Sequence, residues 1–160
     1  MAKEVKTNAM RILDKNKVPY QVISYECDTF IDGIYVAKKT GVPIEQSFKT
    51  IVLKGKSNQY YVFVVPVAEE IDLKKGAKVV GEKSIEMLPV KDITMATGYV
   101  RGGCSPIGMK KQYPVFIHNT AKNYNSIYIS GGRIGTTIVL NPNDLLKVVK
   151  GRYDDIAVSS

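Results

Sequence analysis

The stretch that most restricts how this chain can fold is residues 98–111, GYVRGGCSPIGMKK. Glycine tolerates positive φ angles and close approach of other atoms, and proline holds φ near one value, so four glycines and a proline prescribe a shaped backbone path. The N–H groups of Gly102, Gly103 and Gly108, which no Cβ covers, can face a carbonyl or phosphate oxygen. An ordinary turn between two strands explains the same pattern. The stretch therefore predicts a loop and leaves its function open.

The length and hydrophobic content predict one domain spanning residues 1–160. At 160 residues, with 44% hydrophobic residues, the chain can bury a single core of ordinary size. It has no apolar run near the roughly 20 residues of a membrane helix and no signal-like N-terminus, so we expect a cytoplasmic protein without membrane contact. Cys27 and Cys104 are then expected to be free thiols.

The charge balance predicts a polyanionic partner. Lys and Arg number 23 against 15 Asp and Glu, a formal charge of +8, which favours nucleic acid as the class of partner, although lysines also simply solubilise a surface. A structural metal site needs about four close ligands, which one His and two distant Cys do not supply. We expect no metal and no cofactor.

Hydrophobic periodicity predicts an α+β fold. Helices and strands do not alternate strictly, which disfavours a doubly wound sheet and favours a mixed sheet or partly closed barrel with surrounding helices. Strands 48–54 and 60–67 are expected to pair antiparallel, and Asn141 is expected to cap the last helix. Helices are predicted at residues 3–15, 32–41, 45–49, 71–79, 81–87, 89–96, 119–124 and 142–150, and strands at 20–25, 48–54, 60–67, 114–118, 126–130 and 136–140.

Several kinds of site are disfavoured by the residues themselves. Gly103 and Gly108 have the spacing of a nucleotide triphosphate loop, but Met109 stands where that loop needs lysine. Cys104 with His118 could form a nucleophile and base, yet a small buried cysteine explains Cys104 as well. Lys49, at the entrance of a buried strand, fits a side chain that snorkels to water. What remains is a pocket of backbone amides, a lysine and hydroxyls, which suits the positioning of an already activated ester.

A set of motifs along the whole chain resembles the YbaK/EbsC family. These are YECD at 25–28, FKTIVL at 48–53, LKK at 73–75, TGYVRGGCSPIG at 97–108 and YISGGRIG at 128–135. The resemblance implies the α+β fold of the YbaK and prolyl-tRNA synthetase-associated domains. It also implies a trans-editing deacylase of Cys-tRNA(Pro) and Cys-tRNA(Cys), with prolyl-tRNA synthetase as a candidate partner.

The resemblance also implies roles for individual residues. Lys49 matches the essential lysine of the family, and the substrate's own thiol attacks its ester carbonyl in the family mechanism. Where the Cys-tRNA deacylases have an aspartate, this chain has Thr137, so a hydrolytic deacylase of Ala- or Ser-tRNA and a non-catalytic tRNA- or nucleotide-binding module stay open. The residues that the resemblance places at the substrate are Tyr25, Gly102, Gly103, Cys104, Ser105, Pro106, Gly132 and Thr137.

Overall fold

A computed structural model describes residues 6–25, 37–38 and 40–158. Most of the predicted helix 32–41 lies outside these residues, and so does Cys27. No helix in the described ranges is long and apolar enough to cross a membrane. The elements are α1 (Asn8–Lys15), β1 (Gln21–Ser24), η1 (Ile44–Gln46), β2 (Phe48–Gly55), β3 (Tyr60–Pro66), α3 (Leu73–Val80), β4 (Ile85–Met87), α4 (Val90–Thr97), β5 (Val115–His118), η2 (Asn119–Asn123), β6 (Ile127–Ser130), β7 (Thr136–Leu140), α5 (Pro142–Val149) and β8 (Arg152–Asp154).

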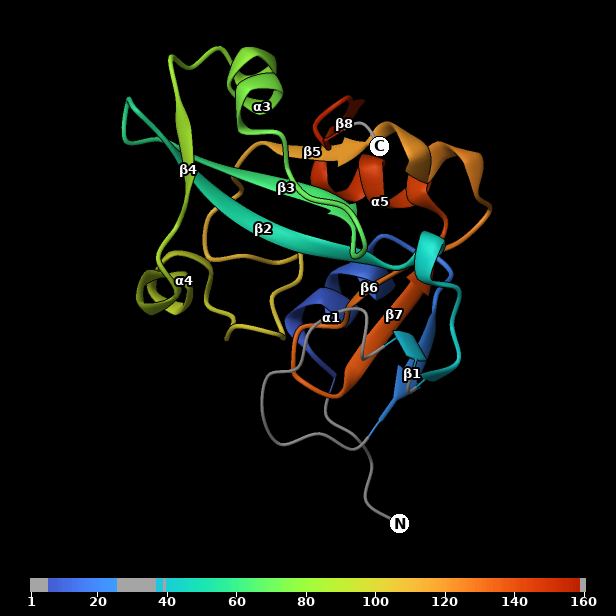
Figure 1. Cartoon of the computed structure of the whole chain (residues 1–160). Coiled ribbons are helices and arrows are strands. Elements are labelled where there is room, and N and C mark those ends of the chain that lie inside the picture. Colours follow the sequence, from blue (N-terminus) through green and yellow to red (C-terminus); the bar gives the residue numbers. More distant parts are fainter. Residues whose placement is uncertain (1–5, 26–36, 39, 159–160) are drawn as a thin grey trace.

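Two separate sheets form the framework (Figure 1). The larger has the strand order β4-β2-β3-β5-β8 and the smaller β1-β7-β6. The hairpin β2–β3 is antiparallel, as predicted, whereas β5 pairs parallel with both β3 and β8. The prediction of a mixed α+β fold is confirmed.

The prediction of a partly closed barrel is wrong. Closure would require the outer edge of β2 to pair along its length with β6, but the described strands meet only at an isolated bridge between Ser47 and Tyr128. Beyond that bridge β2 is bordered by β4, which pairs with Leu53–Gly55. The two sheets therefore join at one point and diverge from it.

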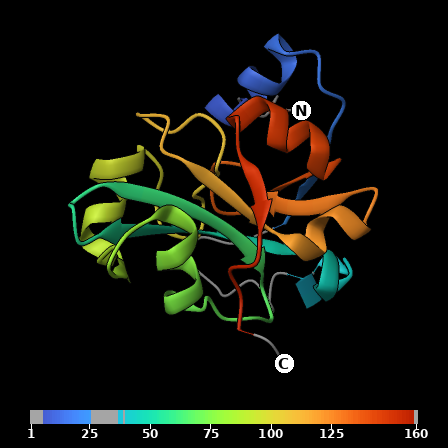
Figure 2. The ribbon, with the colours of Figure 1, turned by 90° about the horizontal axis from the view of Figure 1, so that it is seen from above.

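The main core lies between the two sheets. Val62 and Val64 of β3 pack with Leu13 of α1, Ile138 of β7 and Leu145 of α5, and all five side chains are fully buried. Figure 2 shows α1 and α5 on the same side of the larger sheet, with α3 on the opposite side. The larger sheet is thus covered on both faces, which explains why its central strands are continuously apolar instead of alternating.

A second core fills the space beneath α3. Phe63 and Val65, neighbours in sequence to the β3 residues of the main core, face α3 and Ile156. A Cβ on Gly76 would lie 2.6 Å from the Phe63 ring, so only glycine lets α3 approach the sheet this closely. Helix α3 begins at a cap in which Asp72 accepts a hydrogen bond from Lys75 N at 3.0 Å.

Two predicted elements differ from the structure. The predicted helix 81–87 contains the short strand β4, because Gly81, at φ +77°, ends α3, and Ile85 is buried beneath it. The predicted turn of helix 45–49 ends at Gln46, so Phe48 and Lys49 belong to β2. Strand β8 was not predicted. The cap at Asn141 is confirmed, since its side chain accepts a hydrogen bond from Asn143 N at 2.8 Å.

Candidate active site

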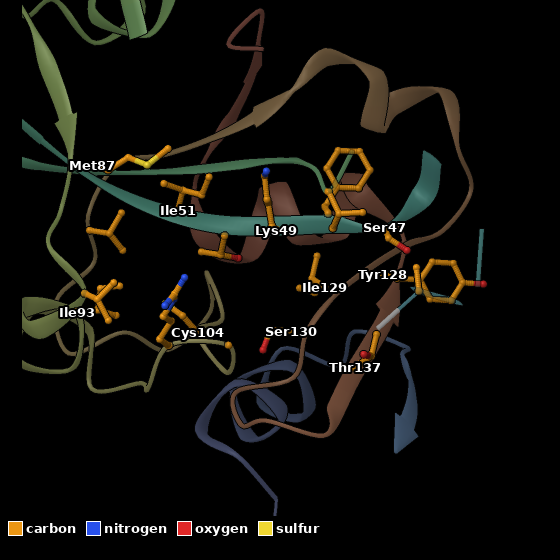
Figure 3. A pocket seen from close by; sticks show the side chains of 18 of the residues that line it. Ser47, Lys49, Ile51, Met87, Ile93, Cys104, Tyr128, Ile129, Ser130 and Thr137 are labelled. Carbon is orange, nitrogen blue, oxygen red and sulfur yellow. The ribbon is translucent and has the colours of Figure 1, made fainter. Parts of the chain in front are cut away.

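A cavity of about 570 Å³ opens where the two sheets diverge (Figure 3). One wall is the outer edge of β2, and the facing wall is formed by β6 and β7. The glycine loop that follows α4 contributes Arg101, Gly102 and Cys104. The cavity is therefore built from segments that lie far apart in the sequence and meet only in the folded chain.

Lys49 lies in the β2 wall, on the edge of the cavity, and its side chain is half-buried. Burial lowers the pKa of its ammonium from the ordinary value, and the negative charge of Glu70 opposes this effect. No carboxylate among the described residues forms an ion pair with Lys49. A partly desolvated cation in a cavity wall can bind an anion such as a phosphate.

The two ends of the cavity differ in polarity. In Figure 3, Ile51, Met87 and Ile93 lie at one end, and the hydroxyl-bearing Ser47, Tyr128 and Thr137 at the other, with Lys49 between them. Ser130, which pairs with Thr137 across β6 and β7, lies between the two ends in Figure 3 and adds another hydroxyl to the cavity. The cavity can thus orient a ligand that is polar at one end and apolar at the other.

The glycine loop, residues 98–111, is folded against a second glycine cluster, SGGRIG at 130–135, and this limits which of its amides can bind a ligand. Gly102 has φ +86° and lines the cavity. The N–H of Gly103 donates to Val100 O at 2.9 Å, so this amide is already used in the turn. A Cβ on Gly103 would lie 2.7 Å from Arg133 Cα. The predicted role of the Gly103 amide at a substrate oxygen is therefore not supported by the geometry.

Three further predicted residues lie behind the cavity wall. Ser105 and Pro106 are buried, and Ser105 Oγ accepts a hydrogen bond from Ile107 N at 3.2 Å. Gly132, at φ +101°, packs against Thr7 and the Tyr99 ring and does not line the cavity. These residues hold the loop in shape. The predicted residues that the structure does bring together in the cavity are Tyr25, Lys49, Gly102, Cys104 and Thr137.

The Cys104 thiol is in the cavity but is not activated. Burial raises its pKa to about 11, so it is protonated at neutral pH and is a poor nucleophile. His118 does not line the cavity, and its Nδ1 accepts a hydrogen bond from Ile156 N at 3.3 Å. The nucleophile–base pair considered from the sequence is not formed.

Comparison with known proteins agrees with this architecture. Residues 34–148 match the family model described as "Aminoacyl-tRNA editing domain". A protein of Enterococcus faecalis, provisionally named Cys-tRNA(Pro)/Cys-tRNA(Cys) deacylase EbsC, is 41% identical over 94% of this chain and 93% of its own length. The chain belongs to the aminoacyl-tRNA editing family. The YbaK/EbsC resemblance predicted from the motifs is confirmed.

The chain is also similar to a more distant relative and to solved structures with low sequence identity. The uncharacterised protein YwhH of Bacillus subtilis is 26% identical over 68% of this chain and 69% of its own. Two crystal structures share the fold. The hypothetical protein APE2540 has a TM-score of 0.87 and 15% sequence identity, over 94% of this chain and 99% of its own. A provisional trans-editing enzyme for prolyl-tRNA synthetase has a TM-score of 0.82 and 20% sequence identity, over 98% of this chain and 100% of its own.

Several residues of the editing-domain cavity were not predicted from the sequence. Tyr128 and Ser130 lie in a segment predicted to be an ordinary strand, while Ser47, Met87 and Ile93 lie in segments predicted to be helical. The motif YISGGRIG at 128–135, which contains both Tyr128 and Ser130, is the sequence signal that could have found these two. Among the described residues, no group of three or more His, Cys, Asp or Glu could hold a metal ion.

Proposed function

We propose that this editing domain acts in trans to remove cysteine from mischarged Cys-tRNA(Pro), and from Cys-tRNA(Cys). One observation carries the proposal: no described residue lining the cavity is a carboxylate or a histidine, and its one thiol is kept protonated by burial. The described part of the cavity lining therefore offers no ordinary base for activating water and no ready nucleophile. A substrate that brings its own nucleophile, the cysteinyl thiol, does not need them.

In the proposed reaction the cysteinyl sulfur attacks the ester carbonyl. A C–S bond forms, the C–O bond to the terminal ribose breaks, the thiol proton ends on the ribose oxygen, and a cyclic thiolactone leaves. The cavity holds the thiol and the carbonyl in an attacking arrangement, an effect worth ~7–11 kcal/mol in well-oriented intramolecular reactions. Lys49 anchors the phosphate or ribose of the terminal adenosine, while Tyr25 and Thr137 line the cavity around the aminoacyl group.

This activity would correct an error that a synthetase cannot avoid by binding alone. Synthetase pockets separate side chains that differ by a methylene-sized group by only ~1–3 kcal/mol, so a second site is needed. The charge of +8 suits a tRNA partner. Prolyl-tRNA synthetase, whose product would be corrected, is the candidate protein partner, and the cytoplasm is the expected location.

The thiol mechanism is tested by comparing Cys-tRNA(Pro) with its S-methylcysteinyl counterpart. We expect deacylation of the first and only the background rate with the second, because methylation removes the nucleophile without removing the ester. Equal enzymatic rates on both would contradict the mechanism.

Lys49→Ala, measured on Cys-tRNA(Pro), is expected to lose most of the activity. Lys54→Ala on the same strand is the matched control, because Lys54 does not line the cavity. Full activity of Lys49→Ala would contradict the role of Lys49, whereas wild-type deacylation no faster than background on every mischarged tRNA would favour a protein that only binds tRNA or nucleotides.

A second candidate function rests on the pair Ser130 and Thr137. These neighbouring hydroxyls offer an uncharged polar surface to the ligand. Such a surface also suits a small Ala or Ser side chain, whose ester water would have to hydrolyse. A panel of mischarged tRNAs decides between the candidates: faster deacylation of Ala- or Ser-tRNA than of Cys-tRNA would favour hydrolysis.

A further inference from the structure

Strand β2 has an unpaired edge where it borders the cavity. On one side β3 pairs with it from Phe48 to Lys54. On the other side Tyr128 meets it only at Ser47, and β4 pairs with it only from Leu53. Between these two contacts the edge faces the cavity (Figure 3). Any main-chain group that points outward there needs a partner from outside the sheet.

Two hydrogen bonds fix which residue points outward. Val52 O accepts from Leu88 N at 3.0 Å, so Val52 directs its main-chain groups away from β3. Ser47 O accepts from Val67 N at 2.8 Å, so odd-numbered residues direct theirs toward β3. In a strand this direction alternates from residue to residue. Thr50 therefore points its N–H and C=O out of the sheet at the edge that borders the cavity.

Thr50 lacks partners in the described chain. It lines the cavity, and no described residue forms a hydrogen bond with its outward N–H or C=O. Its hydroxyl is also buried without a partner among these residues. Main-chain N–H and C=O groups are strong hydrogen-bonding groups, so the two outward groups of Thr50 at the edge of the cavity are available to a bound ligand.

We infer that the main chain of Thr50 binds the aminoacyl group of the substrate as one more residue of an antiparallel strand. The inference rests on the proposed function and names the group that holds the amino acid there. An α-aminoacyl ester carries an N–H donor and a C=O acceptor on adjacent carbons, the same arrangement as one residue of a strand. It can exchange two hydrogen bonds with Thr50, its ammonium donating to Thr50 O and its carbonyl accepting from Thr50 N.

This pairing also sets the direction of the substrate. In an antiparallel pair the carbonyl that accepts from Thr50 N lies toward the start of β2, so the ester and the terminal adenosine extend toward Lys49 and Ser47. Side chains of paired residues share a face of the sheet. The substrate side chain therefore lies on the face of Thr50 and Val52, and Val52 packs with Cys104. Thr50 N–H would also stabilise the negative charge that develops on the attacked carbonyl oxygen.

The outward direction of the N–H makes a single-atom test possible. Thr50→Pro removes this N–H, and proline is tolerated at an edge position whose N–H faces outward. Thr50→Val keeps the N–H and removes only the hydroxyl. We expect Thr50→Pro to melt within a few degrees of Thr50→Val but to lose on the order of a hundredfold in kcat/KM for Cys-tRNA(Pro). A folded Thr50→Pro variant as active as Thr50→Val would overturn the inference.

A binding experiment tests the same contact without catalysis and without a variant. The probes are 3′-amino-3′-deoxyadenosine bearing a cysteinyl amide and the matched 3-mercaptopropionyl amide, which lacks only the α-amino group. Calorimetry with the wild-type protein is expected to show at least about tenfold tighter binding of the cysteinyl probe, because only it can donate to Thr50 O. Equal affinities would overturn the inference.

The two experiments separate this inference from the proposed function. If the wild-type protein deacylates no mischarged tRNA, the proposed activity fails, whereas a preference for the cysteinyl probe that Thr50→Pro abolishes would still support Thr50 as the aminoacyl-binding residue. If deacylation is robust but neither Thr50→Pro nor loss of the α-amino group matters, the activity stands and the role of Thr50 is wrong.

Discussion

Lys49 gives the proposed reaction a characteristic pH dependence. The rate should rise as the substrate thiol ionises, near pH 8.5, and fall as Lys49 loses its proton. Because burial lowers the pKa of Lys49, the falling limb should begin below ~10.4, the value of an exposed lysine. In Lys49→Arg, whose guanidinium stays charged, the fall in rate should begin at a higher pH. The pH profiles of background-corrected kcat/KM for the wild type and for Lys49→Arg measure this shift. If an active Lys49→Arg variant loses its rate at the same pH as the wild type, the role of Lys49 is contradicted.

Cys104 lines the same cavity as Lys49 but is expected to have no chemical role in the reaction. Its thiol is protonated at neutral pH, since burial raises its pKa to about 11, and it contributes packing. Cys104→Ala should therefore keep deacylation of Cys-tRNA(Pro) within a few fold of wild type, and Cys104→Ser should behave similarly. Loss of activity in both variants, with unchanged melting temperature, would restore Cys104 as a chemical participant.

The hydroxyl of Thr50 is expected to lower the free energy of unfolding of the protein. This buried hydroxyl has no partner in the described chain, and removing a group of that kind while keeping the shape of the side chain is neutral or stabilising. Thr50→Val should raise the free energy of unfolding by up to about 1 kcal/mol, as measured by urea denaturation. A clear loss of stability would show that the hydroxyl has a structural partner.

At the scale of elements, two glycines test how the loops are held. Gly103→Ala would place Cβ 2.7 Å from Arg133 Cα, a backbone atom that cannot move aside cheaply, and should cost about 1–3 kcal/mol. Gly81→Ala is the control: it has open space but φ +77°, so the cost should be ~1–2 kcal/mol of backbone strain alone. Only Gly103→Ala should also reduce deacylation, because it displaces the loop that lines the cavity.

Elements with strong local signals were predicted and those defined by tertiary contacts were not. The hairpin β2–β3 and the cap at Asn141 follow from residue chemistry close in sequence. Strand β4, three residues long, exists because Ile85 is buried and its backbone pairs with β2. Strand β8 likewise depends on parallel pairing with β5, which no local pattern reveals.

At the scale of the whole molecule, the positive charge predicts a salt dependence. With a formal charge of +8, kcat/KM for Cys-tRNA(Pro) should fall about tenfold or more between roughly 50 and 200 mM salt, as phosphate contacts are screened. Cysteinyl-adenosine, which lacks the tRNA phosphates, should show little change. A similar loss on both substrates would mean that salt acts on the cavity itself rather than on tRNA binding.

The cavity as a whole was only half predictable. Lys49, Cys104 and Thr137 lie in it as the motifs implied, because the motifs mark the segments that line it. The motifs could not show that Ser105 and Gly132 face away from it, since burial depends on how the two glycine clusters pack. Nor could they show the unpaired edge of β2, which follows from the order of strands in the two sheets.

The divergence of the two sheets from Ser47 and Tyr128 has a consequence for biosynthesis. The β2 wall is synthesised first, and Ser130 and Thr137 of the facing wall leave the ribosome much later. Until then the β2 edge has no opposing wall. A nascent chain, or a chain truncated before β7, therefore lacks a complete cavity, and deacylase activity should appear only after β7 has been synthesised.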